Sequence, residues 1–229
     1  YSFIPFKNTR ADINYLNEKE KSINNIVGHG LLSSKLFRRN NPIFDGKMRS
    51  LTFGFSIFEL LKKNNEDFVS VTVGDLKPDF SLSMELSDKF LGSDFKFIKY
   101  NFSFKYQFPT FLTNLLLKPY FSFEIYGGYS NGKLPPQRLY YLETAYDGYS
   151  PMGTFRNMNI KSFSGNSFLE AHFEHNFRTL PFKLLNWEWM EDQGIETLIF
   201  VSFGNSWLSK ENKNYLNDNY YKDTDGWYS

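Results

Sequence analysis

The sequence predicts an all-β fold: an antiparallel transmembrane β-barrel, or most of one, with roughly nine to eleven strands in the chain. Strict alternation of apolar and polar residues is the first of three observations behind this prediction. The second is that aromatic residues make up 20% of the chain while the mean hydropathy is only -0.46. A barrel with an aromatic outside and a polar inside gives this mixture. The third is that no run of about 18 apolar residues, as a transmembrane helix requires, occurs in the sequence.

The longest alternation runs from Ile98 to Phe108 and predicts one long strand with an apolar and a polar face. At roughly 3.3 Å per residue this run spans about 36 Å, and a tilt of about 40° makes it climb roughly 28 Å. The apolar band of an outer-membrane barrel is about 25 Å tall, whereas strands of soluble proteins average about 5–6 residues. We therefore expect the apolar side chains of this run, here called the comb, to face lipid. Its central members are Tyr100, Phe102, Phe104 and Tyr106.

Shorter alternations predict further strands, at residues 11–15, 51–57, 69–73, 80–86, 121–125, 169–178 and 195–203. Clusters of Asn, Asp, Gly and Pro separate them and predict turns. The stretch from Gly127 to Pro151 is expected to be the longest irregular segment, because it contains Gly127-Gly128 and two adjacent prolines. The stretch from Asn205 to Asp225 is expected to be an exposed loop plus a frayed strand, and a new strand is expected to start near Trp227.

The alternation at residues 169–178 separates charged from aromatic side chains. Phe173 is expected to face lipid together with the comb, and His175 falls on the same side, close to a membrane interface. A register slip by one residue would place charges in hydrocarbon, so the register is expected to be fixed. The opposite face is predicted to form a lumen-facing polar ladder, paired across strands, of Glu170, His172, Glu174, Asn176 and Arg178.

The sequence predicts no metal site, no cofactor and no catalytic residues. His172 and Glu174 share one face of their strand, but no third ligand follows at a readable spacing. Cysteine is absent, which excludes a disulfide scaffold and a thiolate metal site. A net charge of +1 gives no indication of nucleic-acid binding. The expected partners are outer-membrane lipid and other envelope proteins. Trp187, Trp189 and Trp207 flank predicted strands and are expected to anchor at the headgroup level rather than to stack on sugars.

Several motifs in the second half of the chain keep a recognisable order and spacing. They are Gly132-Lys133-Leu134-Pro135, Tyr146-Asp147, Phe155-Arg156-Asn157-Met158-Asn159, Phe168 to Phe177, Leu180 to Leu185, and Leu208-Ser209-Lys210-Glu211-Asn212. In these motifs the chain resembles the carboxy-terminal barrel of a Gram-negative outer-membrane family of unknown function. Full-length members carry a carboxypeptidase-regulatory-like domain before the barrel, and the family is distantly similar to the bacterial surface-antigen barrels.

The resemblance implies one barrel domain over residues 1–229, which we expect to be an excerpt of a longer chain. The regulatory-like domain is not part of this sequence. The chain also lacks the Arg-Gly-Phe triplet that marks the lumen loop of the surface-antigen insertases, and Gly153-Thr154-Phe155-Arg156 differs from that triplet.

These observations favour a non-enzymatic barrel protein of the outer membrane of a Gram-negative bacterium, acting in envelope biogenesis or in the passage of material. Two alternatives remain open. One is a membrane-embedded lipid hydrolase that uses His172 or His175 with a Ser and an Asn, although no G-x-S-x-G motif is present. The other is a soluble β-protein that binds a lipid or a sugar between its sheets.

Overall fold

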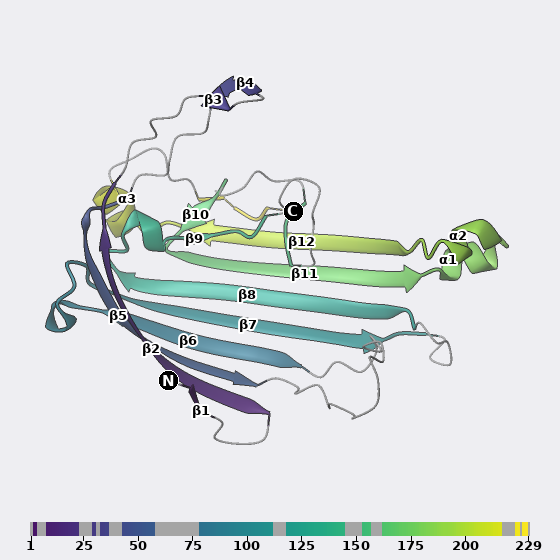
Figure 1. The fold of residues 1–229 in the computed structure, drawn as a ribbon, viewed down its shortest axis with the longest axis horizontal. Coiled ribbons are helices and arrows are strands. Elements are labelled where there is room, and N and C mark those ends of the chain that lie inside the picture. The colour runs from purple at the N-terminus through teal and green to yellow at the C-terminus, as the bar shows by residue number, and fades with distance from the viewer. Residues whose placement is uncertain are drawn as a thin grey trace.

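A computed structural model of the chain describes residues 2–3, 8–22, 29–30, 33–36, 43–57, 78–111, 118–144, 153–156, 162–216, 223–224 and 226–228. Its main sheet has eight strands in the order β1-β2-β5-β6-β7-β8-β11-β12, and every neighbouring pair is antiparallel (Figure 1). Strands that follow one another in the described chain are thus mostly neighbours, as in an up-and-down arrangement. The prediction of an all-β antiparallel fold is confirmed.

The strands of the main sheet are β1 (Ser2–Phe3), β2 (Thr9–Glu20), β5 (Gly46–Ile57), β6 (Asp79–Ser87), β7 (Phe97–Pro109), β8 (Tyr120–Gly132), β11 (Ser167–Arg178) and β12 (Thr197–Trp207). There are also two small two-stranded sheets. One pairs β3 (His29–Gly30) with β4 (Ser33–Leu36), and the other pairs β9 (Tyr140–Tyr141) with β10 (Ser164–Gly165). The helices are η1 (Lys89–Leu91), η2 (Pro136–Arg138), α1 (Leu180–Leu184), α2 (Glu188–Asp192) and α3 (Lys210–Leu216). None of the helices in the described ranges is long and apolar enough to cross a membrane.

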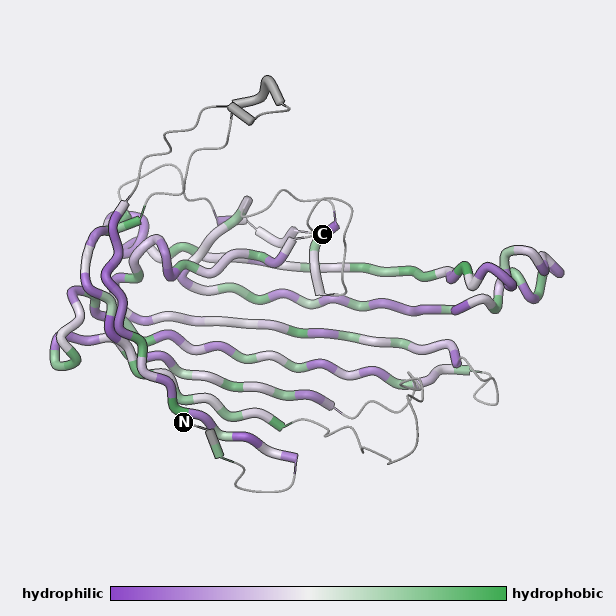
Figure 2. Tube along the Cα trace, in the orientation of Figure 1, coloured by the Kyte–Doolittle hydropathy of each residue, from purple (hydrophilic) through white to green (hydrophobic). Residues whose placement is uncertain are grey.

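Strand register divides the sheet into two faces of opposite character. Because side chains alternate along a strand, residues paired across strands share a face. Apolar and polar residues therefore alternate along much of the sheet, as in β6 and β7, when it is coloured by hydropathy (Figure 2). We call the apolar side the outer face and the polar side the inner face. One row of residues paired across β5, β6 and β7 on the outer face is Phe53, Met84 and Tyr100. The neighbouring row on the inner face is Thr52, Glu85 and Lys99.

Within the described residues the sheet is open, with β1 at one end of the strand order and β12 at the other. The carboxy-terminal residues extend it along the outer edge of β12. The backbone N–H groups of Gly204 and Tyr228 donate to each other's carbonyl groups over 2.8 and 2.7 Å, and the N–H of Thr224 donates to the carbonyl of Ser206 over 3.3 Å. The strand expected near Trp227 is thus present as an antiparallel bridge.

A compact apolar core closes the inner side of the sheet at the end that carries α3. Buried Asn212 of α3 ties this end to the chain after β8, because its side chain accepts the Leu134 N–H over 2.9 Å and donates to the Gly132 carbonyl over 3.2 Å. The core brings together β5, the start of β7, the segment around η2, and α3; its buried members are Met48, Phe95, Phe97, Leu134, Leu139, Leu208 and Leu216.

The prediction that Gly127 begins an irregular stretch is wrong, since β8 continues to Gly132. Both glycines lie inside the strand because large rings occupy the places of their missing side chains. A Cβ on Gly127 would meet the Phe102 ring on the outer face at 2.1 Å, and a Cβ on Gly128 would meet the Tyr140 ring on the inner face at 2.5 Å. At these two positions glycine leaves space for a neighbouring ring and does not mark a turn.

The prediction of an exposed loop from Asn205 onward is also wrong. β12 includes residues up to Trp207, and residues 210–216 form α3, whose Asn212 and Leu216 are buried. Three polar residues of this stretch, Asn205, Ser206 and Asn212, are buried, whereas Lys210, Glu211, Lys213 and Asn214 of α3 are exposed. The alternation at residues 69–73, which predicted a strand, lies outside the described residues.

Candidate functional site

Four residues of the predicted ladder lie on the inner face of β11, and contact of this face with a lumen stays a prediction. Glu170, His172, Glu174 and Asn176 are 0%, 2%, 8% and 3% exposed. The first three contact the chain that follows β8, here called the inner segment and comprising the described residues 134–144, 153–156 and 162–166. Burial of four polar side chains in one row demands partners, because an unpaired buried polar group is costly.

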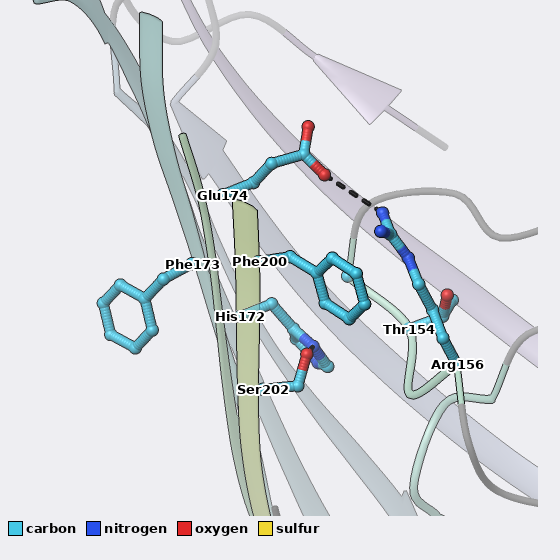
Figure 3. A pocket seen from close by; sticks show the side chains of 8 residues that line it. Thr154, Arg156, His172, Phe173, Glu174, Phe200 and Ser202 are labelled. Atoms are coloured by element: carbon cyan, nitrogen blue, oxygen red, sulfur yellow. Dashed lines mark hydrogen bonds and ion pairs between the residues drawn. The ribbon is translucent and has the colours of Figure 1, made fainter. Parts of the chain in front are cut away.

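Glu174 is held by an ion pair with the inner segment. The Arg156 guanidinium donates to Glu174 Oε2 over 3.0 Å, and its Cζ lies 3.9 Å from the centre of the Phe200 ring on β12 (Figure 3). The same view shows Phe173 pointing away from this cluster, on the other side of the sheet. A charge-assisted hydrogen bond and a cation–π contact together fix one arginine of the inner segment against two strands.

His172 contacts a serine on the neighbouring strand and an aromatic ring of the inner segment. Its Nδ1 lies 2.9 Å from Ser202 Oγ, and the ring meets Phe155 edge-on with centroids 5.1 Å apart. Phe155 is 1% exposed and also meets Tyr228 edge-on at 5.6 Å. Gly204 makes room for the Phe155 ring, because a Cβ on Gly204 would lie 2.5 Å from it.

Glu170 accepts a hydrogen bond from the backbone N–H of Glu143 over 3.2 Å. Its other oxygen has no partner within the described residues. Nearby on β8, the Tyr126 hydroxyl donates to Glu124, and Lys105 of β7 lies 3.7 Å from the same carboxylate. The middle of the inner face is thus a connected row of acidic, phenolic and basic groups.

Asn176 and Arg178 share Glu196 as a partner at the far end of β11. The Asn176 amide donates to Glu196 Oε2 over 2.7 Å, and Arg178 donates to Glu196 Oε1 over 2.6 Å. A register shift lies between the two residues, and Arg178 has a positive φ of 57°. Strict alternation therefore ends before Arg178, and the contact with Glu196 rather than the pleat fixes this side chain.

A second cluster holds the beginning of the inner segment. Arg138 lies 3.5 Å from Glu85 of β6, and its carbonyl accepts a hydrogen bond from Lys99 Nζ over 3.0 Å. The Tyr140 hydroxyl donates to the backbone carbonyl of Tyr100 over 2.6 Å, and Lys99 Nζ lies 4.1 Å from the Tyr140 ring centre. The inner segment is therefore attached to the sheet at several sites, among them one on β6–β7 and one on β11–β12.

The outer face contrasts with these clusters, because its large apolar side chains are partly exposed. Tyr100 is 39% and Phe102 37% exposed. Phe173 stacks on Phe123 with centroids 6.4 Å apart. Further rings of the comb, Phe104 and Tyr106, contact Phe123 at 5.5 and 5.9 Å. Contact of this face with lipid stays a prediction.

His175 is a polar residue among the rings of the outer face. Its Nε2 lies 2.9 Å from Thr110 Oγ1 just after β7, and its ring contacts Phe177 at 4.1 Å and Phe111 at 5.5 Å. It sits three positions before the end of β11, close to one rim of the sheet. The two histidines of β11 therefore lie on opposite faces and do not form one site.

The cluster around His172 leaves little room for a ligand. The cavity between Arg156, His172, Glu174 and Ser202 has a volume of about 10 Å³, which is space for about one water molecule. No group of three or more Asp, Glu or His side chains in the described ranges is placed to bind a metal ion. The arrangement is suited to holding the inner segment in place.

Sequence reasoning missed the partners that the inner segment supplies. Phe155 and Arg156 were visible in a motif, but nothing local indicated that they would meet residues of β11 and β12. Ser202 could have been found, because it alternates with Val201 and Phe203 and so belongs to the polar face of β12.

Comparison with known proteins connects this architecture to a family. A family model described as the Omp85 superfamily domain matches residues 12–223, which includes every long strand of the sheet and the inner segment. Neither the curated proteins nor the solved structures that were compared gave a match. Since the matched range is most of the sequence, the chain belongs to the Omp85 superfamily.

Proposed function

We propose that the chain is a non-enzymatic β-barrel protein of the Gram-negative outer membrane, acting in envelope biogenesis or in the passage of material. In this proposal the outer face contacts lipid, the inner face lines the lumen, and the inner segment lies within that lumen. Membership of the Omp85 superfamily, a family of outer-membrane proteins, supports the proposal.

The observation that carries the proposal is the inverted distribution of polar and apolar side chains. On adjacent strands, Phe203 is 41% and Val201 44% exposed, whereas Glu170 is 0% and His172 2% exposed. A water-soluble domain buries its large apolar residues and seldom buries a glutamate. A barrel in lipid requires the reverse, with an apolar band outside and polar groups inside.

Two neighbouring substitutions on β5 test this proposal. Phe53 is 41% exposed on the outer face, whereas Thr52 lies on the inner face opposite Glu85. An arginine on the lipid side of a barrel costs about 2–4 kcal/mol at the midplane. Phe53→Arg should therefore abolish or strongly reduce insertion into phospholipid vesicles, measured by flotation and protease protection, whereas Thr52→Arg should insert like the wild type.

The same pair separates the membrane proposal from the soluble alternative. If the exposed apolar face met water, Phe53→Arg would be harmless and would increase solubility without detergent. Equal insertion of the two variants, or a soluble Phe53→Arg monomer, would reject the barrel in the membrane.

Narrower statements within this proposal rest on the motif resemblance. We propose that the chain belongs to the branch whose members carry a carboxypeptidase-regulatory-like domain before the barrel. The absence of an Arg-Gly-Phe triplet favours a task other than insertion of other barrels. Reconstitution with an unfolded outer-membrane protein as the substrate tests this, because an insertase would accelerate its folding into vesicles.

A lipid hydrolase is the second candidate, and the contact of His172 with Ser202 at 2.9 Å favours it. A serine nucleophile needs a base at such a distance, and an acid or amide that orients the base. Within the described residues the second ring nitrogen of His172 has no partner, and the adjoining cavity of about 10 Å³ cannot admit an acyl chain. Ser202→Ala should leave any phospholipase activity of the purified protein unchanged; a loss specific to this variant would establish the enzyme.

A further inference from the structure

A cavity of about 280 Å³ opens between the ends of β8, β11 and β12 and the start of α3. It lies at the α3 end of the sheet, remote from α1 and α2 (Figure 1). The polar ladder does not use it, whereas Asn166, at the end of the inner segment, belongs to its lining. Its lining combines two exposed rings with hydroxyl, amide and carboxylate groups, a composition that suits a small polar ligand with an apolar face.

The two rings lie in one row of the outer face with a small residue between them. Ser167 of β11 is paired with Tyr129 of β8 on one side and with Trp207 of β12 on the other. Tyr129 is 56% and Trp207 42% exposed. Two strand spacings place the bases of these rings about 10 Å apart, which admits one ring stacked between them at about 3.5–4.0 Å from each.

The floor of the cavity is rigid, whereas its rim offers free polar groups. The side chains of Asn166 and Asn212 are buried and already hydrogen-bonded. Asn166 accepts the Ser209 N–H over 2.7 Å, and Asn212 accepts the Leu134 N–H over 2.9 Å. In the described part of the chain, no side-chain hydrogen bond is made by Asn131, Ser167 or Glu211, which also line the cavity. A ligand could therefore bond to the rim without displacing an existing contact.

The charges of the lining select among polar ligands. Among the described residues that line the cavity, Glu211 is charged, and none of them is Lys or Arg. An anionic phosphate would meet no cation and one carboxylate, so the site does not suit it. A sugar suits it, because a pyranose presents a C–H face to aromatic rings and hydroxyl groups to amides and carboxylates.

We propose that this cavity, the ring slot around Ser167, binds a neutral saccharide ring stacked between Tyr129 and Trp207. The inference goes beyond the proposed function and is independent of barrel closure. Because the slot lies where the apolar outer face meets the polar strand ends, the saccharide could be free or could be the headgroup of a glycolipid. In both cases the site would recognise a saccharide ring stacked between the two aromatic rings.

The test is binding of defined sugars to the full chain in lauryldimethylamine oxide, a detergent without sugar. The probes are methyl glucoside, methyl galactoside and N-acetylglucosamine as free sugars, and octyl glucoside below its micellar concentration. Isothermal titration calorimetry measures binding in every variant, because Trp207, which lines the slot and meets Trp227 edge-on at 6.3 Å, is itself replaced in one of them.

Ser167→Leu should weaken saturable binding at least about tenfold by filling the slot, whereas Ser167→Ala, which keeps the slot open and removes one hydroxyl, should weaken binding much less. Trp207→Leu, which removes one stacking face, should act like Ser167→Leu and serves if the latter does not fold. Trp189→Leu, at the opposite end in α2, is the matched tryptophan control.

Saturable binding of a free sugar with this pattern of variants supports a saccharide site as such. Binding of octyl glucoside alone, with the same pattern, supports a glycolipid headgroup. Octyl glucoside binding that survives both Ser167→Leu and Trp207→Leu is adsorption to the apolar face and overturns the proposal. Absence of saturable binding for all four probes overturns it as well.

Discussion

The outer and inner faces of the same strands are stabilised in different ways. On the outer face, rings such as Phe173 and Phe123 contact one another in loose stacks and remain partly exposed. On the inner face, Glu174 and Tyr140 each have named partners at 3.0 and 2.6 Å and are almost fully buried. Side chains one position apart along a strand are thus held by different interactions: ring contacts on the outer face, and hydrogen bonds and ion pairs on the inner face.

This difference predicts where the molecule tolerates change. An outer-face ring is not locked by a hydrogen bond, so its neighbours can move into the surrounding medium when it is altered. An inner-face group is fixed by directional bonds to a segment distant in sequence, so its alteration leaves a buried polar group without a partner. Matched substitutions on the two faces are therefore the sharpest tests of the assignment.

The largest of these effects is expected at the ion pair between Arg156 and Glu174. Arg156→Ala leaves Glu174, which is 8% exposed, without its donor. Loss of a hydrogen bond to a charged buried group costs about 1.5–3 kcal/mol. We expect a lower midpoint of urea unfolding in detergent, together with faster cleavage of the inner segment by added protease.

The control is Lys96→Ala on the ion pair with Asp88, in which the Lys96 side chain is 76% exposed. This pair is screened by solvent, so its removal should hardly change the midpoint. Equal shifts for the two variants would contradict the assignment of Arg156 to a buried anchor.

The next effect compares two adjacent glycines of β8. Gly128→Ala drives a Cβ to 2.5 Å from the Tyr140 ring on the inner face, where Tyr140 is 6% exposed and hydrogen-bonded. Overpacking of this kind costs about 1–3 kcal/mol. Gly127→Ala meets the Phe102 ring, which is 37% exposed and can rotate outward, so it should cost much less.

Chemical unfolding of both alanine variants measures this comparison, and tryptic cleavage of the inner segment checks the cause. If Gly127→Ala lowers the free energy of unfolding more than Gly128→Ala does, the outer face is packed more tightly than the inner face, which contradicts the expected difference between the two faces.

The outer face could be predicted from the sequence because its signal is local. A period of two over residues 98–108 needs no knowledge of the rest of the chain, and β7 spans Phe97–Pro109. The same reasoning located β2 from Ala11, Ile13 and Tyr15. It also placed Glu170 to Asn176 on one face, because alternation within a strand is a matter of backbone geometry.

The inner contacts could not be predicted because they depend on pairs far apart in sequence. Arg156 and Glu174 come together only once the inner segment has folded back over β11 and β12. The same cause explains the error at Gly127-Gly128: without Phe102 and Tyr140 in place, two adjacent glycines indicate a turn. The helical fold of residues 210–216 likewise follows from burial of Asn212 and Leu216 against remote segments.

The smallest effect compares two tyrosine hydroxyls, one on each side of the sheet. The Tyr140 hydroxyl donates to the Tyr100 carbonyl over 2.6 Å, whereas Tyr106 on the outer face makes no side-chain hydrogen bond within the described ranges. Tyr140→Phe should lower the free energy of unfolding by about 0.5–1.5 kcal/mol, and Tyr106→Phe should leave it nearly unchanged.

The pH dependence of the Tyr140→Phe effect gives a second measurement. Burial, and next the nearby Glu85 carboxylate, raise the pKa of the Tyr140 phenol above its ordinary value. The folded state therefore keeps this proton where the unfolded chain has lost it. The contribution of the phenol is fully present below pH of about 10 and falls as the pH rises further. The difference between wild type and Tyr140→Phe should accordingly shrink above that pH in alkaline unfolding curves. A difference that stays constant across this pH range would mean that the phenol is accessible to solvent and that the inner segment does not lie against β7 and β8.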